Sequence, residues 1–127
     1  MENAFRALLT SSAAVTAHVP ATRINFGTHP QGAQFPGIVL NTIDDAEGMT
    51  FTGPDGLSQA RVQVDCYGAT YAEAKSLART VRGDLNGFSG GQFQGVFLAL
   101  SRDYHETGAA DRPYRVSMDF LVKWSAL

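Results

Sequence analysis

The sequence predicts an α+β fold: an antiparallel β-sheet of at least four strands packed against one main helix, plus an N-terminal helix. Two stretches, 58–67 and 114–124, alternate between apolar and polar side chains, which is typical of strands with one buried face. A third stretch, 70–86, has apolar side chains at steps of three and four, which is typical of a helix with one buried stripe. The predicted order is helix, strand, strand, helix, strand, strand, and each pair of strands is expected to form a hairpin.

The N-terminal part of the chain is predicted to hold a helix and a strand. Residues 2–18 are expected to be helical, with Phe5 on the apolar face, and the Ala-rich stretch 13–17 either continues or restarts the helix. Val19-Pro20 ends it, because a residue before proline disfavours the helical conformation. After it, the composition predicts a short extended piece at 23–26, a loop at 27–36 and a strand at 37–43.

Residues 44–57 are predicted to form the longest polar connection in the chain, and they hold the candidate partner contact. Its residues are Asp44, Asp45, Glu47, Met49 and Phe51. Hairpin loops usually need about 2–5 residues, so this connection is longer than its strands require. We expect it to be mobile in the free subunit and to order on a neighbour, with the two apolar side chains as anchors. The alternative is that the loop simply tolerates exposed apolar groups.

The second half of the chain is predicted to begin with the main helix. Thr70 is its expected cap, with Glu73 at capping-box spacing, and Gly87 is its expected stop. A Gly-rich loop at 88–95, a strand from 96 to about 104, a turn at 105–113 and a last strand at 114–124 follow. The residues expected in the core are Val64, Leu77, Val81 and Phe120.

Length and charge limit the class of protein. The chain has 127 residues, which suits a single domain spanning 1–127. Lys and Arg total 10 against 12 Asp and Glu, a formal net charge of −2, which argues against gripping duplex DNA by neutralising phosphates. No signal-peptide pattern is present, and the best apolar run, 96–100, is far shorter than the ~20 residues of a membrane span. We expect a soluble protein made in a reducing cytoplasm.

The sequence shows no pattern typical of catalytic or cofactor chemistry, so we expect no enzyme, no cofactor and no metal. The histidines His18, His29 and His105 do not combine with Cys66 at zinc-ligand spacing. Cys66 falls on the apolar side of its strand, which favours a buried core residue over a nucleophile. Residues 87–91 lack the Gly-Lys-Ser/Thr ending of a phosphate-binding loop and are expected to be a flexible connector.

The remaining acidic residues favour structural interpretations. Asp44, Asp45 and Glu47 lack the EF-hand pattern, which favours a solvated loop over a cation site. Two further acidic residues, Asp65 and Asp119, fall on the polar faces of their strands. They are expected to pair across the sheet with basic residues, the candidates being Arg61 and Arg115.

Three stretches carry a family resemblance that extends over nearly the full chain. They are Pro36-Gly-Ile-Val-Leu40, Arg61-Val-Gln-Val-Asp-Cys-Tyr-Gly68 with the capped helix start at Thr70-Tyr71-x-Glu73-Ala74, and Tyr114-Arg-Val-Ser-Met-Asp-Phe120. In these stretches the chain resembles the tail terminator proteins, also called tail completion or head-to-tail joining proteins, of siphophages and gene transfer agents. They are signatures of a fold, and they include no catalytic motif.

The resemblance implies a structural virion protein that forms a hexameric ring at the head–tail junction and is assembled in the cytoplasm of a bacterial host. Such a ring caps the tail tube, ends its polymerisation and provides the docking interface to the head connector. The implied partners are further copies of the chain, the major tail tube protein and a connector or stopper protein, with DNA only in transit through the lumen and no membrane. Two alternatives stay open: a small α+β enzyme or ligand-binding domain with its pocket under 27–36 and 86–95, or another neck protein such as a connector-side stopper.

Overall fold

The computed structural model of the chain describes residues 1–28, 35–50, 53–105 and 114–125. In chain order the elements are α1 (Glu2–Thr10), α2 (Ala13–Thr16), the 3-10 helix η1 (Ala21–Arg23), β1 (Ile24–Phe26), β2 (Gly37–Thr50), β3 (Gly53–Gly68), α3 (Tyr71–Leu85), β4 (Phe88–Gly90), β5 (Phe93–His105) and β6 (Tyr114–Trp124). The predicted α+β class is confirmed. Among the described residues, no helix has the length and apolar character needed to cross a membrane.

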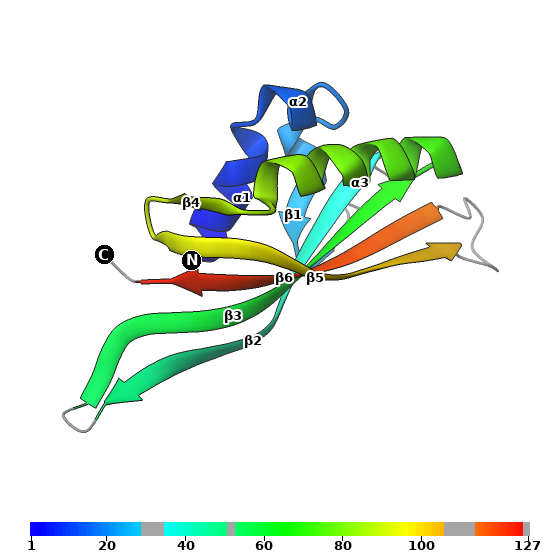
Figure 1. Cartoon of the computed structure of the whole chain (residues 1–127). Coiled ribbons are helices and arrows are strands. Elements are labelled where there is room, and N and C mark those ends of the chain that lie inside the picture. The colour runs from blue at the N-terminus through cyan, green and yellow to red at the C-terminus, as the bar shows by residue number, and fades with distance from the viewer. Residues whose placement is uncertain (29–34, 51–52, 106–113, 126–127) are drawn as a thin grey trace.

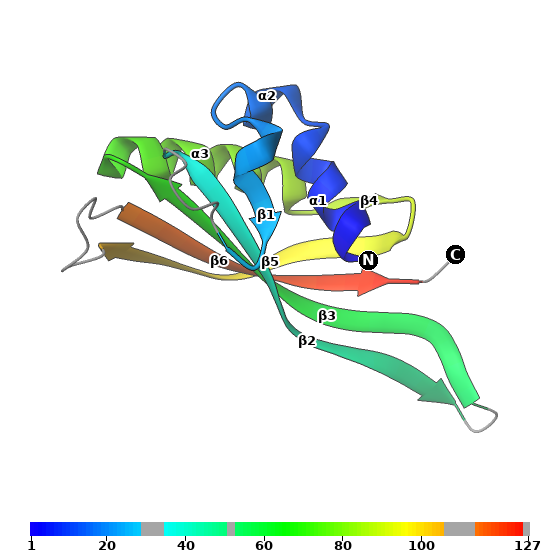
Figure 2. The same ribbon diagram turned by 180° about the vertical axis from the view of Figure 1, so that it is seen from behind.

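The strands form one twisted sheet of six strands in the order β1-β2-β3-β6-β5-β4. The five strands from β2 to β4 pair antiparallel, as predicted, whereas β1 pairs with β2 in parallel, so the sheet is mixed. The helices α1, α2 and α3 lie on one face of this sheet (Figure 1, Figure 2). The long β2–β3 hairpin projects beyond the layer of helices at one end of the molecule.

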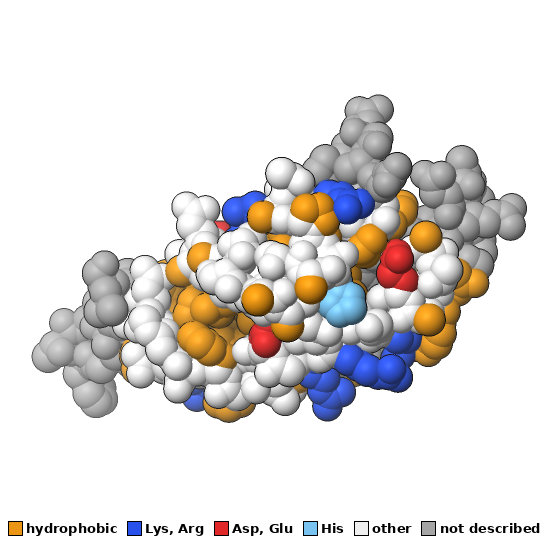
Figure 3. All heavy atoms as spheres, turned by 90° about the horizontal axis from the view of Figure 1, so that it is seen from above, with side chains coloured by type: hydrophobic (Ala, Val, Ile, Leu, Met, Phe, Trp, Pro, Cys, Tyr) orange, Lys and Arg blue, Asp and Glu red, His pale blue; other side chains and the backbone are white. Residues whose placement is uncertain are grey.

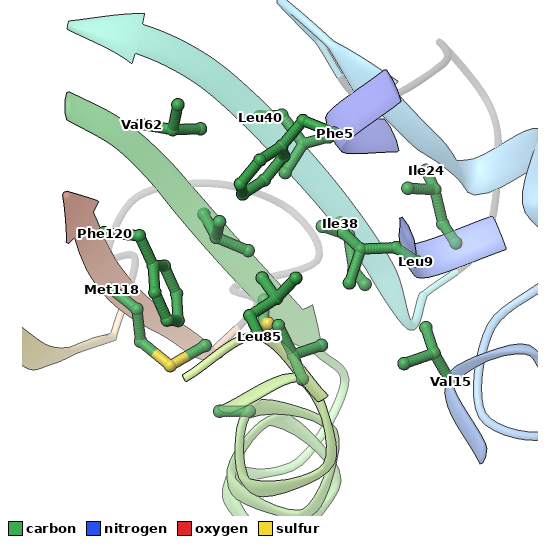
Figure 4. Close-up of a cluster of buried hydrophobic side chains, with 14 of the residues drawn as sticks. Phe5, Leu9, Val15, Ile24, Ile38, Leu40, Val62, Leu85, Met118 and Phe120 are labelled. Atoms are coloured by element: carbon green, nitrogen blue, oxygen red, sulfur yellow. The ribbon is translucent and has the colours of Figure 1, made fainter. Parts of the chain in front are cut away.

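The core lies between the helices and the face of the sheet that they cover. Phe5 and Leu9 of α1 and Val15 of α2 are fully buried together with apolar side chains of β1, β2, β3 and β6 (Figure 4). The four predicted core residues Val64, Leu77, Val81 and Phe120 are all buried completely. α3 contacts β3, β5 and β6, so it shares the covering of the sheet with the two N-terminal helices.

The turn from β3 into α3 follows the predicted capping box. The Thr70 hydroxyl accepts a hydrogen bond from the Glu73 backbone N–H at 3.1 Å, and the Glu73 carboxylate accepts one from the Ala69 N–H at 2.9 Å. Gly68 ends the strand where a Cβ atom would lie 2.6 Å from the backbone nitrogen of Ala74. This turn therefore requires glycine, because the chain passes too close for a side chain.

The N-terminal helix restarts instead of continuing through residues 2–18. α1 ends at Thr10, and the Ser12 hydroxyl caps α2 by accepting a hydrogen bond from the Val15 N–H. The same hydroxyl donates a hydrogen bond to Asp84 on α3. The break lets the chain change direction and pack two short helices beside α3.

Two predicted loops are wrong. The connection 44–57 is not a loop, because β2 and β3 continue as a paired hairpin as far as Thr50 opposite Gly53, with two register shifts. The sequence of this segment lacks the apolar–polar alternation that is typical of strands. A two-stranded ribbon that projects past the core does not bury one face, so it needs no such alternation. The Gly-rich loop predicted at 88–95, which overlaps the flexible connector predicted at 87–91, is also not a loop: β4 pairs with the start of β5 across a tight turn in which Gly91 has φ +55°. The expected loop 27–36 and turn 105–113 lie largely outside the described residues.

Candidate functional site

The described part of the chain gathers no metal-ligating cluster of three or more His, Cys, Asp or Glu side chains. The His18 ring lies beside the Thr80 hydroxyl at 3.4 Å, and His29 lies outside the described residues. Cys66 is fully buried, as its place in the alternation predicted. Burial raises the pKa of the Cys66 thiol far above its usual range, and the charge of Asp65 raises it further. The thiol is therefore protonated and inaccessible, which does not suit a nucleophile.

Four of the five predicted partner-contact residues lie on β2 instead of in a loop: Asp44, Asp45, Glu47 and Met49. Asp44 is the register partner of Arg61, and Asp45 that of the buried Ala60, so the two carboxylates point to opposite faces of the sheet. The Asp45 carboxylate accepts a hydrogen bond from the indole nitrogen of Trp124 at 3.2 Å, which ties the base of the hairpin to β6. This separation also removes the basis for a cation site at the acidic cluster.

The other predicted contacts lie nearer the tip of the same hairpin. Glu47 is exposed and opposite Ser58, and the backbone of Met49 is paired with Pro54. Phe51 lies outside the described residues. The hairpin from Asp44 to Leu57, which we call the arm, is thus a preformed two-stranded element.

A polar network occupies the sheet face opposite the helices, which we call the outer face. Arg61 donates two hydrogen bonds to one oxygen of Asp119, at 3.2 Å from Nε and 3.0 Å from Nη2. The guanidinium of Arg102 lies 3.8 Å from the same oxygen. The predicted pairing of Asp119 with Arg61 across β3 and β6 is confirmed. This pair is sheltered, since Asp119 is only 7% exposed.

Gln63 links the second half of this network. Its amide nitrogen donates to Asp65 at 3.1 Å and to the Ser117 hydroxyl at 2.9 Å. Asp65 is 4% exposed and Ser117 is fully buried, although both are polar. Hydrogen-bonded polar groups of this kind fix the register of neighbouring strands, because a shift would leave them buried without partners.

Beside the network, β5 exposes large apolar side chains. Phe97 is 50% exposed, Leu100 44% and Tyr104 39%, and the guanidinium of Arg115 lies 4.5 Å from the centre of the Tyr104 ring. Sequence reasoning did not single these residues out, although the run Val96-Phe-Leu-Ala-Leu100 is apolar without alternation. A strand that is apolar on both faces needs a partner on each, and the fold supplies one only for the face toward the helices.

A hollow of about 750 Å³ opens where the arm leaves the outer face. Its walls are both charged and apolar, and its lining includes Asp44, Leu57, Arg61, Leu121 and Lys123. The surface combines apolar side chains with carboxylate, guanidinium and ammonium groups. A mixed surface of this kind suits contact with another protein surface.

Comparison with known proteins gives a family and a fold. The sequence profile of the family described as tail completion protein gp17 matches residues 3–123. A chain of the virion of a native gene transfer agent (GTA) particle has the same fold, with a TM-score of 0.74, 19% sequence identity, and coverage of 94% of this chain and 90% of that chain. Sequence comparison with curated proteins finds none that matches.

Proposed function

The chain belongs to the tail completion protein gp17 family, and from this premise we propose that it is a structural subunit of a virion tail. In this proposal six copies form a ring that caps the tail tube, ends its polymerisation and provides the docking interface to the head connector. The observation that carries the proposal is the family match, which spans residues 3–123 of 127. The ring is assembled in the cytoplasm of the bacterial host and lies at the head–tail junction of the finished particle.

The surfaces of the subunit support an assembly role. A closed ring needs two different contact surfaces on every subunit, because each copy touches two neighbours in a head-to-tail manner. The arm and the exposed side chains of β5 belong to different ends of the sheet order, since β2 and β5 are separated by β3 and β6. A globular chain of this length has an effective diameter of ~36 Å, so six in a ring leave a hole about as wide as one subunit. DNA passes through that hole without being held, which the net charge of −2 favours.

The arm is the element we assign to partner contact. Asp44, Asp45 and Glu47 provide charge near its base, and Met49 and Phe51 are the proposed apolar anchors near its tip. In place of a loop that orders on a neighbour, the paired strands present Asp44, Asp45 and Glu47 in a fixed arrangement. A preformed contact loses less conformational entropy on binding than a mobile loop does.

The experiment that tests this function follows the length of tail tubes. Tubes assembled from the major tail tube protein are observed by electron microscopy with and without the purified chain. We expect rings at the tube ends and a stop to elongation in its presence. Tubes that elongate unchanged, with a chain that stays monomeric at all concentrations, would overturn the proposal.

A shortened arm tests the proposed contact residues in the same assay. Residues 48–57 are replaced by Asn-Gly, which joins the register partners Glu47 and Ser58 by a two-residue turn. We expect the fold to persist, because the core strands are untouched, and attachment to the tube to fail. A control that keeps the arm at full length but replaces only Met49 and Phe51 with Ser separates the anchors from the hairpin itself.

The two alternatives have different signatures in this assay. An enzyme or ligand-binding domain was expected to have its pocket under 27–36 and 86–95. The hollow at the base of the arm is lined mainly by β2, β3 and β6, and Gln94 is its one lining residue from these two segments. A connector-side stopper would bind the connector and leave tube length unchanged.

A further inference from the structure

The sheet has a free strand edge at each end of its strand order. On one side, β1 covers β2 only as far as Leu40, so the edge of β2 from Asn41 to Thr50 pairs with no other described strand. On the other side, β4 covers β5 only as far as Val96, and the Asn86 side chain caps the Leu98 N–H. Beyond this cap, the edge of β5 has no described strand beside it. The arm and this part of β5 lie at opposite ends of the molecule (Figure 1, Figure 2).

The two free edges carry opposite charge. The free edge of β2, residues 41–50, contains three acidic residues and no Lys or Arg. Beside the free part of β5, α3 presents Arg79 and Arg82, which are exposed and have no ion-pair partner among the described residues. Lys and Arg side chains also gather along one flank of the helix-bearing face in Figure 3. A shallow hollow between α3 and β5, lined by both arginines and by Ser101, lies at this edge.

The faces of the two edges match as well as their charges. Glu47 pairs with Ser58 and lies on the helix side of the sheet by alternation, the side on which α3 carries its arginines. Asp44 pairs with Arg61 and lies on the outer face, where Arg102 of β5 also lies, beside Asp119. If one sheet continues into the next with its helices on the same side, Glu47 meets the side that carries Arg79 and Arg82, and Asp44 meets the side that carries Arg102. The described carboxylate on the free part of β5, Asp103, is already paired with Lys75 at 3.3 Å.

We propose that the edge of β2 at residues 44–47 of one subunit pairs with the free edge of β5 in a second copy of this chain. Glu47 then faces Arg79 and Arg82 of that copy, and Asp44 faces its Arg102. The contact is heterologous, since the donor and acceptor edges differ, and repetition of it joins the sheets of successive subunits into a closed ring. This inference rests on the proposed ring, and it names the surfaces through which neighbouring subunits of that ring contact each other.

Site-directed cross-linking tests the contact directly. One preparation carries Glu47→Cys and another Arg82→Cys, and the mixture is treated with a short bifunctional maleimide. Cys66 is fully buried, so the wild-type chain is the control for background reaction. We expect covalent dimers only in the mixture, and a ladder of products up to the ring size when both cysteines are in one chain. Pairing Glu47→Cys with Ser76→Cys, on another flank of α3, should give no product.

The outcomes separate this inference from the ring itself. Sedimentation of the wild-type chain, alone and with assembled tail tubes, reports whether oligomers form. No oligomer in either case overturns the proposed ring and the contact with it. Oligomers without the 47–82 product, or Glu47→Cys chains that cross-link to one another, overturn the contact alone.

A charge exchange provides a second readout that does not depend on a cross-linker. The arm variant is Asp44→Lys with Glu47→Lys, and the edge variant is Arg79→Glu with Arg82→Glu. Each variant alone should weaken association at least about tenfold, because like charges then meet across the contact. Mixing the two variants should restore alternating association. Equal association of all preparations would show that these charges do not lie at the interface.

Discussion

The sheltered ion pair on the outer face provides the sharpest test of the energetics. In Asp119→Asn the shape of the side chain is kept and its charge is lost. The two bonds from Arg61 to Asp119, at 3.0 and 3.2 Å, then lose their ionised acceptor, while the guanidinium donor keeps its charge. Loss of one partner costs about 0–1 kcal/mol for an exposed ion pair and about 3–5 kcal/mol for a buried one, so the gross loss for this partly buried pair is about 2 kcal/mol. The Arg61 side chain is 35% exposed and regains hydration, which lowers the expected cost to about 1–2 kcal/mol.

Asp103→Asn is the matched control, because Asp103 forms an ion pair of the same kind that is more exposed. Its carboxylate lies 3.3 Å from Lys75, with 42% of the Asp103 side chain exposed, and a surface pair of this kind contributes at most about 1 kcal/mol. In urea denaturation, Asp119→Asn should lower the midpoint by roughly 0.5–1 M, using a slope of about 2 kcal/mol per M, and Asp103→Asn by clearly less. Added salt should reduce the effect of Asp103→Asn more than that of Asp119→Asn. Equal losses in the two variants would refute the argument that shelter from water strengthens the pair.

Three further substitutions test the packing of the core and the expectation that the chain needs neither a catalytic cysteine nor a metal. Leu77→Asp places a charge in the fully buried core and should prevent soluble folding; soluble, native protein from this variant would show that the α3 face is misassigned. Gly68→Ala forces a Cβ to within 2.6 Å of the Ala74 backbone and should cost about 1–3 kcal/mol, measured as a lower thermal midpoint; an unchanged midpoint would contradict the close approach. Cys66→Ser, and separately a chelator, should leave assembly intact, with a modest loss of stability for the substitution; loss of assembly under either would revive a catalytic or metal-dependent function.

The parts of the fold that the sequence predicts well are those in which burial repeats along the chain. The main helix was expected at 70–86 and spans Tyr71–Leu85 with Thr70 as its cap, and the last strand was expected and found at 114–124. In both, one face is covered by the core, so apolar residues recur with the period of the backbone. The capping box adds a local signal that does not depend on the rest of the fold.

The elements that the sequence did not predict lack such a repeat. From Asp44 to Glu47 the arm is exposed on both faces of the sheet, and register shifts at Thr42/Asp44 and Glu47/Met49 break the alternation that remains. β4 has only three residues and is recognisable only through its pairing with β5. The outer-face pair of Arg61 and Asp119 was predicted because both residues lie on clear strands, whereas no local pattern shows that the run at 96–100 is half exposed.

Because the arm is a paired hairpin and not a loop, its free strand edge bears on how subunits associate. A projecting hairpin with a free edge is a hazard, because two such edges can pair with each other and begin aggregation. The charged residues at 41–57 are all acidic, with no Lys or Arg among them. Two arms therefore repel each other, which disfavours pairing between identical edges. The same charges favour the basic edge formed by Arg79 and Arg82 on a second copy. Repulsion between identical edges disfavours symmetric pairs, and attraction between different edges favours head-to-tail contacts, which are the contacts from which rings form.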